Sequence, residues 1–63
     1  MLSQETLRDR LLKYIKVEGV NQKHIAIKAK ISESDLSRFK NKKSELGYID
    51  SKSLDKFLTT KNY

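Results

Sequence analysis

Polar side chains gather between residues 32 and 41, and their spacing fits one side of a helix. Leu36 and Phe39 mark the apolar side, and at roughly 100° per residue the opposite side carries hydroxyl, guanidinium, amide and carboxylate groups. An α-helix fits the major groove of B-DNA, where such groups can form hydrogen bonds with base edges. We therefore predict that base contacts come from Glu33, Ser34, Ser37, Arg38 and Asn41.

Several of these side chains also have an ordinary structural interpretation. Arg38 is the first candidate, because its guanidinium can donate two hydrogen bonds to O6 and N7 of guanine, but a cation also favours a helix C-terminus. Ser34 and Ser37 could bind bases or phosphates, or simply be exposed helical positions. Glu33 could accept a hydrogen bond from N4 of cytosine. The stronger expectation for Glu33 is that its charge favours the helix N-terminus.

The positive charge of the chain is concentrated in its middle third. The formal net charge is +6, and residues 21–43 hold seven basic and two acidic side chains, a net of +5. Most charge runs are solvated faces, but this concentration favours a polyanionic partner, with nucleic acid ahead of an anionic membrane surface. We expect phosphate contacts, which position a protein without reading sequence, from Lys23, Lys40, Lys42 and Lys43.

The composition argues against catalysis. The chain has no cysteine and one histidine, so it lacks the residues for a thiolate or histidine metal cluster. No spacing links a nucleophile to a base, and no glycine-rich loop is present. We predict no enzyme, no cofactor, no metal and no small-molecule substrate. No apolar run approaches the roughly 20 residues of a membrane span, and residues 1–6 lack signal-peptide features, so we expect a cytoplasmic protein without membrane contact.

Short helices would position these side chains. Apolar spacing near 3.6 predicts helices over residues 4–18, 22–29, 32–40 and 51–60. Gly19 is the expected end of the first helix, and Asp35 would reach back to complete a capping box in the third. Residues 41–50 would form a connection around Gly47. The expected N-terminal caps are Ser3, Asn21, Ser32 and Asp50.

The apolar stripes predict one all-α domain over residues 1–63, a compact bundle of four helices or of five. In the connection, Leu46, Tyr48 and Ile49 are available to pack on the core. Only residues 30–32 separate the second and third helices, and so short a link favours the steep crossing of a helix-turn-helix. The inner faces are formed by Leu7, Leu11, Tyr14, Ile15, Ile25, Ala26, Ala29, Leu36, Phe39, Leu54, Phe57 and Leu58.

The segment from Gln22 to Asn41 resembles the helix-turn-helix of the phage repressor/Cro-like (XRE) family of DNA-binding regulators. The shared features are a glutamine that opens the segment, the small Ala26 four residues later, the Ile31-Ser32 pair at the turn, and Ser37-Arg38-Phe39 near the end. With the flanking helices, the resemblance covers nearly the whole chain. It implies a lambda repressor-like fold in which Gln22 contacts phosphate and braces the recognition helix.

Two features depart from the family pattern. Lys30 occupies a turn position where the family usually has glycine, because this residue tends to be left-handed, and lysine there would cost about 1–2 kcal/mol. The second departure is length. Many family members continue into a fifth helix or a C-terminal dimerisation domain, whereas this chain stops at Tyr63, which leaves the mode of dimerisation open.

The sequence therefore predicts a sequence-specific double-stranded DNA-binding transcriptional regulator, in particular a small repressor. A homodimer would read half-sites roughly 34 Å apart. One alternative is a protein-interaction module on the same fold, such as an antitoxin-like or anti-repressor partner; another is non-specific binding of DNA or RNA through charge. Apolar residues off the main stripes form either an association patch or isolated surface positions. They are Leu12, Ile27, Tyr48 and Tyr63.

Overall fold

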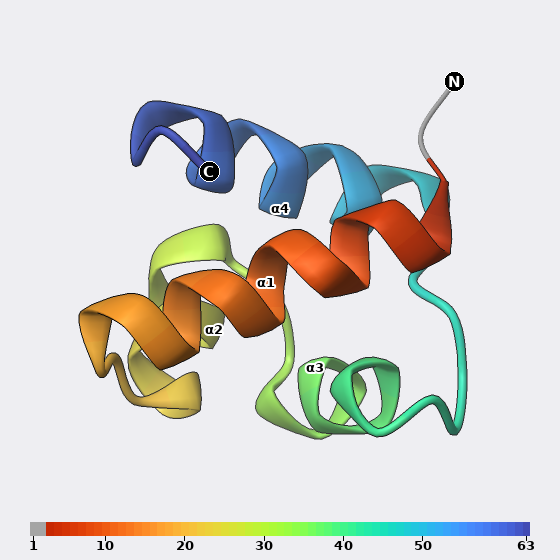
Figure 1. Cartoon of the computed structure of the whole chain (residues 1–63). Coiled ribbons are helices and arrows are strands. Elements are labelled where there is room, and N and C mark those ends of the chain that lie inside the picture. Colours follow the sequence, from red (N-terminus) through yellow and green to blue (C-terminus); the bar gives the residue numbers. More distant parts are fainter. Residues whose placement is uncertain (1–2) are drawn as a thin grey trace.

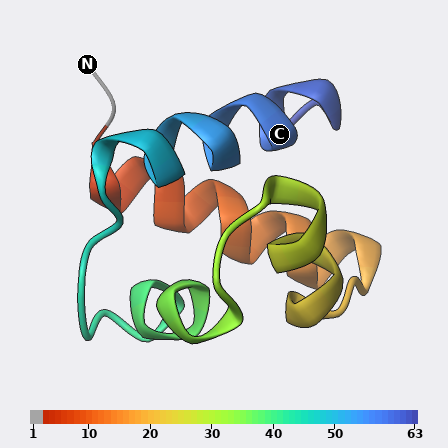
Figure 2. The same cartoon turned by 180° about the vertical axis from the view of Figure 1, so that it is seen from behind.

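The computed structural model describes residues 3–63 as an all-α bundle, which confirms the predicted fold class (Figure 1). The helices of this part of the chain are α1 (Gln4–Glu18), α2 (Gln22–Ala29), α3 (Glu33–Lys40) and α4 (Tyr48–Thr60). Each helix packs against two others: α1 and α2 both contact α3 and α4. Figures 1 and 2 show α4 and α3 on opposite sides of α1. None of these helices is long and apolar enough to cross a membrane.

The first two helices begin at the predicted caps. The Ser3 hydroxyl accepts a hydrogen bond from the Thr6 amide at 3.4 Å, and Asn21 Oδ1 accepts one from the Lys23 amide at 2.8 Å. Gly19 ends α1 in the left-handed conformation (φ 65°) and donates its N–H to the Ile15 carbonyl. These bonds satisfy backbone groups that a helix end leaves without a partner.

The predicted starts of the last two helices are partly wrong. Ser32 precedes α3 but makes no side-chain capping bond, so the capping box does not form. The fourth helix begins at Tyr48 rather than Ser51, with Gly47 before it, and Asp50 lies in its first turn instead of capping it. Tyr48 and Ile49 are 75% and 77% exposed, so they add no apolar stripe that would have marked this extra turn. The prediction that they pack beneath the connection is therefore wrong, whereas the alternative for Tyr48, an aromatic surface position off the main stripes, agrees with its exposure.

The core joins all four helices. Leu36 and Phe39 of α3 are fully buried, and Leu46 is the part of the connection that packs inward. Of the predicted inner faces, Ile15 and Phe57 are only half-buried at its edge. The other buried apolar residues are Leu7, Leu11, Tyr14, Ile25, Ala26, Ala29, Ile31, Leu54 and Leu58.

The turn between α2 and α3 has the conformation that the family resemblance implies. Lys30 is left-handed (φ 58°), and its N–H donates to the Ile27 carbonyl. The Ile31 N–H donates to the Ala26 carbonyl at 2.9 Å, and the Ile31 side chain is buried. This pair of bonds is a Schellman motif, which usually places glycine where Lys30 stands. The short link thus directs α3 away from the axis of α2, as in a helix-turn-helix.

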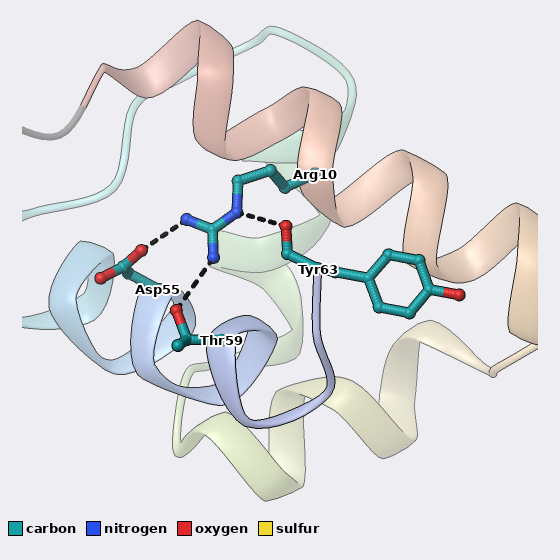
Figure 3. A network of polar contacts seen from close by, with 4 residues as sticks. All are labelled: Arg10, Asp55, Thr59 and Tyr63. Atoms are coloured by element: carbon teal, nitrogen blue, oxygen red, sulfur yellow. Dashed lines mark hydrogen bonds and ion pairs between the residues drawn. The ribbon is translucent and has the colours of Figure 1, made fainter.

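Polar contacts fix α4 to α1 at both ends. At one end, Gln4 Nε2 donates to Ser51 Oγ at 3.0 Å, and the Leu46 N–H donates to Gln4 Oε1 at 3.1 Å. At the other end, the Arg10 guanidinium binds the Asp55 carboxylate, the Thr59 hydroxyl and the Tyr63 carbonyl (Figure 3). These contacts fix α1 and α4 to each other. α2 packs against α4, and α3 packs against α1.

Candidate nucleic-acid interface

The N-terminal end of α2 and the outer side of α3 form a shallow hollow of about 600 Å³, called here the α2–α3 hollow. It is lined by Gln22, Glu33, Ser34, Ser37 and Arg38. The fold therefore brings together four of the five predicted base-reading residues with the glutamine singled out by the family resemblance. Asn41, the fifth, does not line the hollow. It follows the last residue of α3 and is exposed.

Packing against α1 and α2 sets which side of α3 faces outward. Leu36 and Phe39 are fully buried, whereas Ser34 and Arg38 on the other side are exposed. The Phe39 carbonyl accepts a hydrogen bond from Nε of the buried Arg8 at 2.7 Å, and the Arg8 guanidinium lies 4.8 Å from the centre of the Phe39 ring. Apolar packing and this charged bond therefore orient the helix, without support from the residues of the hollow.

One ion pair lies on α3 beside the hollow. Arg38 Nη2 donates a hydrogen bond to Asp35 Oδ1 at 2.9 Å, three residues earlier on the same helix. Asp35 therefore contacts the first candidate base-reading side chain rather than the cap that the sequence predicted. Both side chains are about half exposed, at 57% for Arg38 and 48% for Asp35, so a ligand can reach them.

The predicted phosphate-binding lysines flank the hollow instead of lining it. Lys23 follows Gln22 at the start of α2 and is exposed. Lys40 is the half-buried last residue of α3, and the exposed Lys42 and Lys43 come directly after it. The lining itself holds one acidic and one basic side chain, Glu33 and Arg38. Positive charge thus lies at the N-terminal end of α2 and at the C-terminal end of α3.

Part of the charge surplus lies on another surface. Lys28 and Lys30 belong to the basic window of residues 21–43, but they line a second hollow of about 390 Å³ between the C-terminal end of α2 and α4. On the α4 side, Lys56 and the half-buried Phe57 also line this second hollow. The charge count over residues 21–43 therefore overestimates the charge available next to α3.

The positioning role of Arg8 was not predicted from the sequence. A signal was present, because positions 8, 11 and 15 share a helical face, which places Arg8 on the apolar side of α1. The predicted capping role of Asp35 was wrong, because an acidic residue in a first helical turn can favour the helix N-terminus, cap the helix or pair with a residue three positions later. Sequence alone does not separate these possibilities.

The α2–α3 hollow is lined by side chains that can form hydrogen bonds. It offers hydroxyl, amide, carboxylate and guanidinium groups. Across residues 3–63, no three His, Asp or Glu side chains gather closely enough to hold a metal ion. Comparisons with protein-family models, curated proteins and solved structures find no match to this chain.

Proposed function

We propose that this protein is a sequence-specific DNA-binding regulator that inserts α3 into the major groove. The observation that carries the proposal is the α2–α3 hollow, which joins Gln22 to four outward-facing residues of α3. These groups come from two helices, and they face solvent while the opposite sides of α2 and α3 pack in the core. The family resemblance agrees with this arrangement, since it assigns the same helix to base reading.

The dimensions and chemistry of α3 suit this role. An α-helix with its side chains is roughly 10–12 Å in diameter, which is comparable to the width of the major groove. Arg38 would donate two hydrogen bonds to a guanine, and Ser34, Ser37 and Glu33 would contact neighbouring base edges or phosphates. Asn41, at the end of the helix, would contact the last base of the site. Each well-formed arginine–guanine pair adds discrimination of about 1–3 kcal/mol.

The flanking cations would supply most of the affinity. Lys23 and Gln22 would contact one stretch of DNA backbone, and Lys40, Lys42 and Lys43 another. If each subunit contacts four to six phosphates, log Kd against log salt should have a slope of about 4 to 5 in magnitude. In our proposal the protein acts in the cytoplasm as a small repressor. A homodimer would bind two half-sites one helical turn apart.

Selection of bound duplexes from a random pool tests the proposal. We expect the wild-type chain to enrich a defined sequence, and Arg38→Ala to lose that preference. Lys13→Ala is the matched control, because it removes an exposed cation from α1, outside the α2–α3 hollow. Equal affinity for selected and scrambled duplexes would refute sequence reading, and binding independent of salt would refute the phosphate contacts.

A second candidate function is a protein-interaction module. The observation that favours it is the adjacent pair Tyr48 and Ile49, which are 75% and 77% exposed at the start of α4. A partner surface there would lie outside the α2–α3 hollow. Replacing both residues by serine would then abolish partner binding, whereas Arg38→Ala would leave it intact. Loss of DNA binding in Arg38→Ala, with DNA binding retained by the serine variant, would support the DNA-binding proposal.

A further inference from the structure

The Asp35 side chain has a defined contact but no capping role. Its Oδ1 accepts a hydrogen bond from Arg38 Nη2 at 2.9 Å, and no side-chain bond caps the start of α3. An acidic residue in a first helical turn also stabilises the positive end of the helix, as the neighbouring Glu33 does. The position of Asp35 beside Arg38 also affects how Arg38 would meet DNA, an inference that rests on the function proposed above.

The ion pair restricts the Arg38 guanidinium without occupying it. A guanidinium carries five N–H groups in a fixed plane, and guanine requires two of them. The bond to Asp35 uses one N–H, so enough donors remain for O6 and N7 of guanine. Because the plane is already held on one side, less side-chain freedom is lost when the base binds. Asp35 therefore favours an arginine that is oriented for a base.

The carboxylate also changes the charge that DNA meets at the centre of the interface. Arg38 and Glu33 line the hollow, and Asp35 beside them makes the three together net negative. Phosphates are therefore attracted to the flanking lysines and not to the part of α3 that lines the hollow. A duplex in the wrong register, with phosphate rather than guanine near Arg38, is repelled by Asp35. A duplex with guanine near Arg38 accepts hydrogen bonds from the guanidinium, while the Asp35 carboxylate keeps its bond to Arg38.

We propose that Asp35 is a specificity-determining residue that orients Arg38 toward guanine and weakens binding to unselected DNA. It acts through Arg38 and through its own charge, so it is a positioning residue rather than a base contact. The proposal differs from a purely structural role, because it requires Asp35 to lower affinity for the wrong sequence while it raises discrimination.

The test compares Asp35→Asn with Asp9→Asn, which removes the same charge from an exposed position on α1. Binding is measured at fixed salt to the duplex selected by the wild-type chain and to a scrambled duplex. For Asp35→Asn we expect affinity for the scrambled duplex to rise about two- to fivefold, because one negative charge near several phosphates is removed. We expect the ratio of the two affinities to fall about tenfold. Asp9→Asn should leave that ratio unchanged.

A second comparison separates orientation from charge. In an Arg38→Ala background, Asp35→Asn should raise affinity for the selected and the scrambled duplex by the same factor, so the ratio of the two affinities should fall no further. Circular dichroism verifies folding, and Asp35→Ser serves as a second variant if the asparagine chain is unstable. An unchanged ratio in Asp35→Asn, or an equal loss with and without Arg38, would overturn the inference about Asp35. Failure of the wild-type chain to prefer any duplex would instead reject the proposed function, and the inference with it.

Discussion

Replacing Lys30 by glycine should stabilise the protein. Lys30 is left-handed with φ 58°, a conformation that costs a residue with a side chain about 1–2 kcal/mol. Glycine removes this strain, but it also makes the unfolded chain more flexible, which offsets about 0.4–1 kcal/mol. Loss of a cation at the C-terminal end of α2 offsets about 0.3 kcal/mol more. The net gain of about 0.5 kcal/mol corresponds to a rise of about 2–4 °C in the melting temperature of a domain this small.

Lys28→Gly is the matched control for this measurement. It makes the same chemical change two residues earlier, at an exposed position inside α2, and both lysines line the same hollow. Glycine within a helix costs about 1 kcal/mol, so this variant should melt about 4–8 °C below the wild type. Thermal unfolding followed by circular dichroism at 222 nm would show the two shifts with opposite sign. If Lys30→Gly melts at or below the wild-type temperature, the turn is not strained and the reasoning is refuted.

Two further substitutions test the scaffold. Arg8→Ala should lower the free energy of unfolding by about 2–3 kcal/mol in urea denaturation, because it removes a buried charged hydrogen bond to the Phe39 carbonyl; an effect as small as that of Lys13→Ala would contradict this role. Tyr63 donates its hydroxyl to Glu18 at 2.7 Å, and this bond, together with the Glu18 charge, raises the pKa of Tyr63 above 10.0. The hydrogen bond therefore contributes fully to stability below pH 10, and its contribution is lost as the pH rises through the folded-state pKa of Tyr63. Between pH 9 and 12 the wild type should lose more free energy of unfolding than Tyr63→Phe. Parallel profiles of unfolding free energy against pH would refute the contact.

The helices were predictable where local signals agreed with tertiary packing. α1 and α2 combine a capping side chain, an apolar stripe and a defined end, and their bounds match the prediction. The start of α4 lacks such agreement. Gly47 is a weaker sign of a helix start than Ser, Thr, Asp or Asn, and the exposed Tyr48 and Ile49 extend no buried stripe, so the first turn was assigned to the connection. This turn forms because the Ser51 N–H reaches the Gly47 carbonyl at 2.8 Å while the Ser51 side chain binds Gln4.

The residues that line the α2–α3 hollow were predictable in type and position, but Asn41 and the predicted phosphate-binding lysines lie outside it, and its internal contacts were not predicted. The spacing of Leu36 and Phe39 assigns the opposite side of α3 to solvent, and that side contributes four residues to the α2–α3 hollow. The meeting of Gln22 with this side depends on the crossing of two helices, for which the sequence offered only the short turn and a family resemblance. The Asp35–Arg38 pair was missed because one carboxylate satisfied several local rules equally well.

In α3, the side chains that hold the helix in place differ from those proposed to contact DNA. The effect of a substitution on DNA binding can therefore be separated from its effect on stability. A helix of eight residues is not stable alone, so α3 depends on Leu36, Phe39 and the Arg8 bond to hold its position. The exposed Ser34 and Arg38 contribute little to that support, since neither is buried and an exposed ion pair adds at most about 1 kcal/mol. A substitution at either position that changes duplex preference without a large change in melting temperature therefore marks a DNA contact. A substitution that changes both marks part of the support.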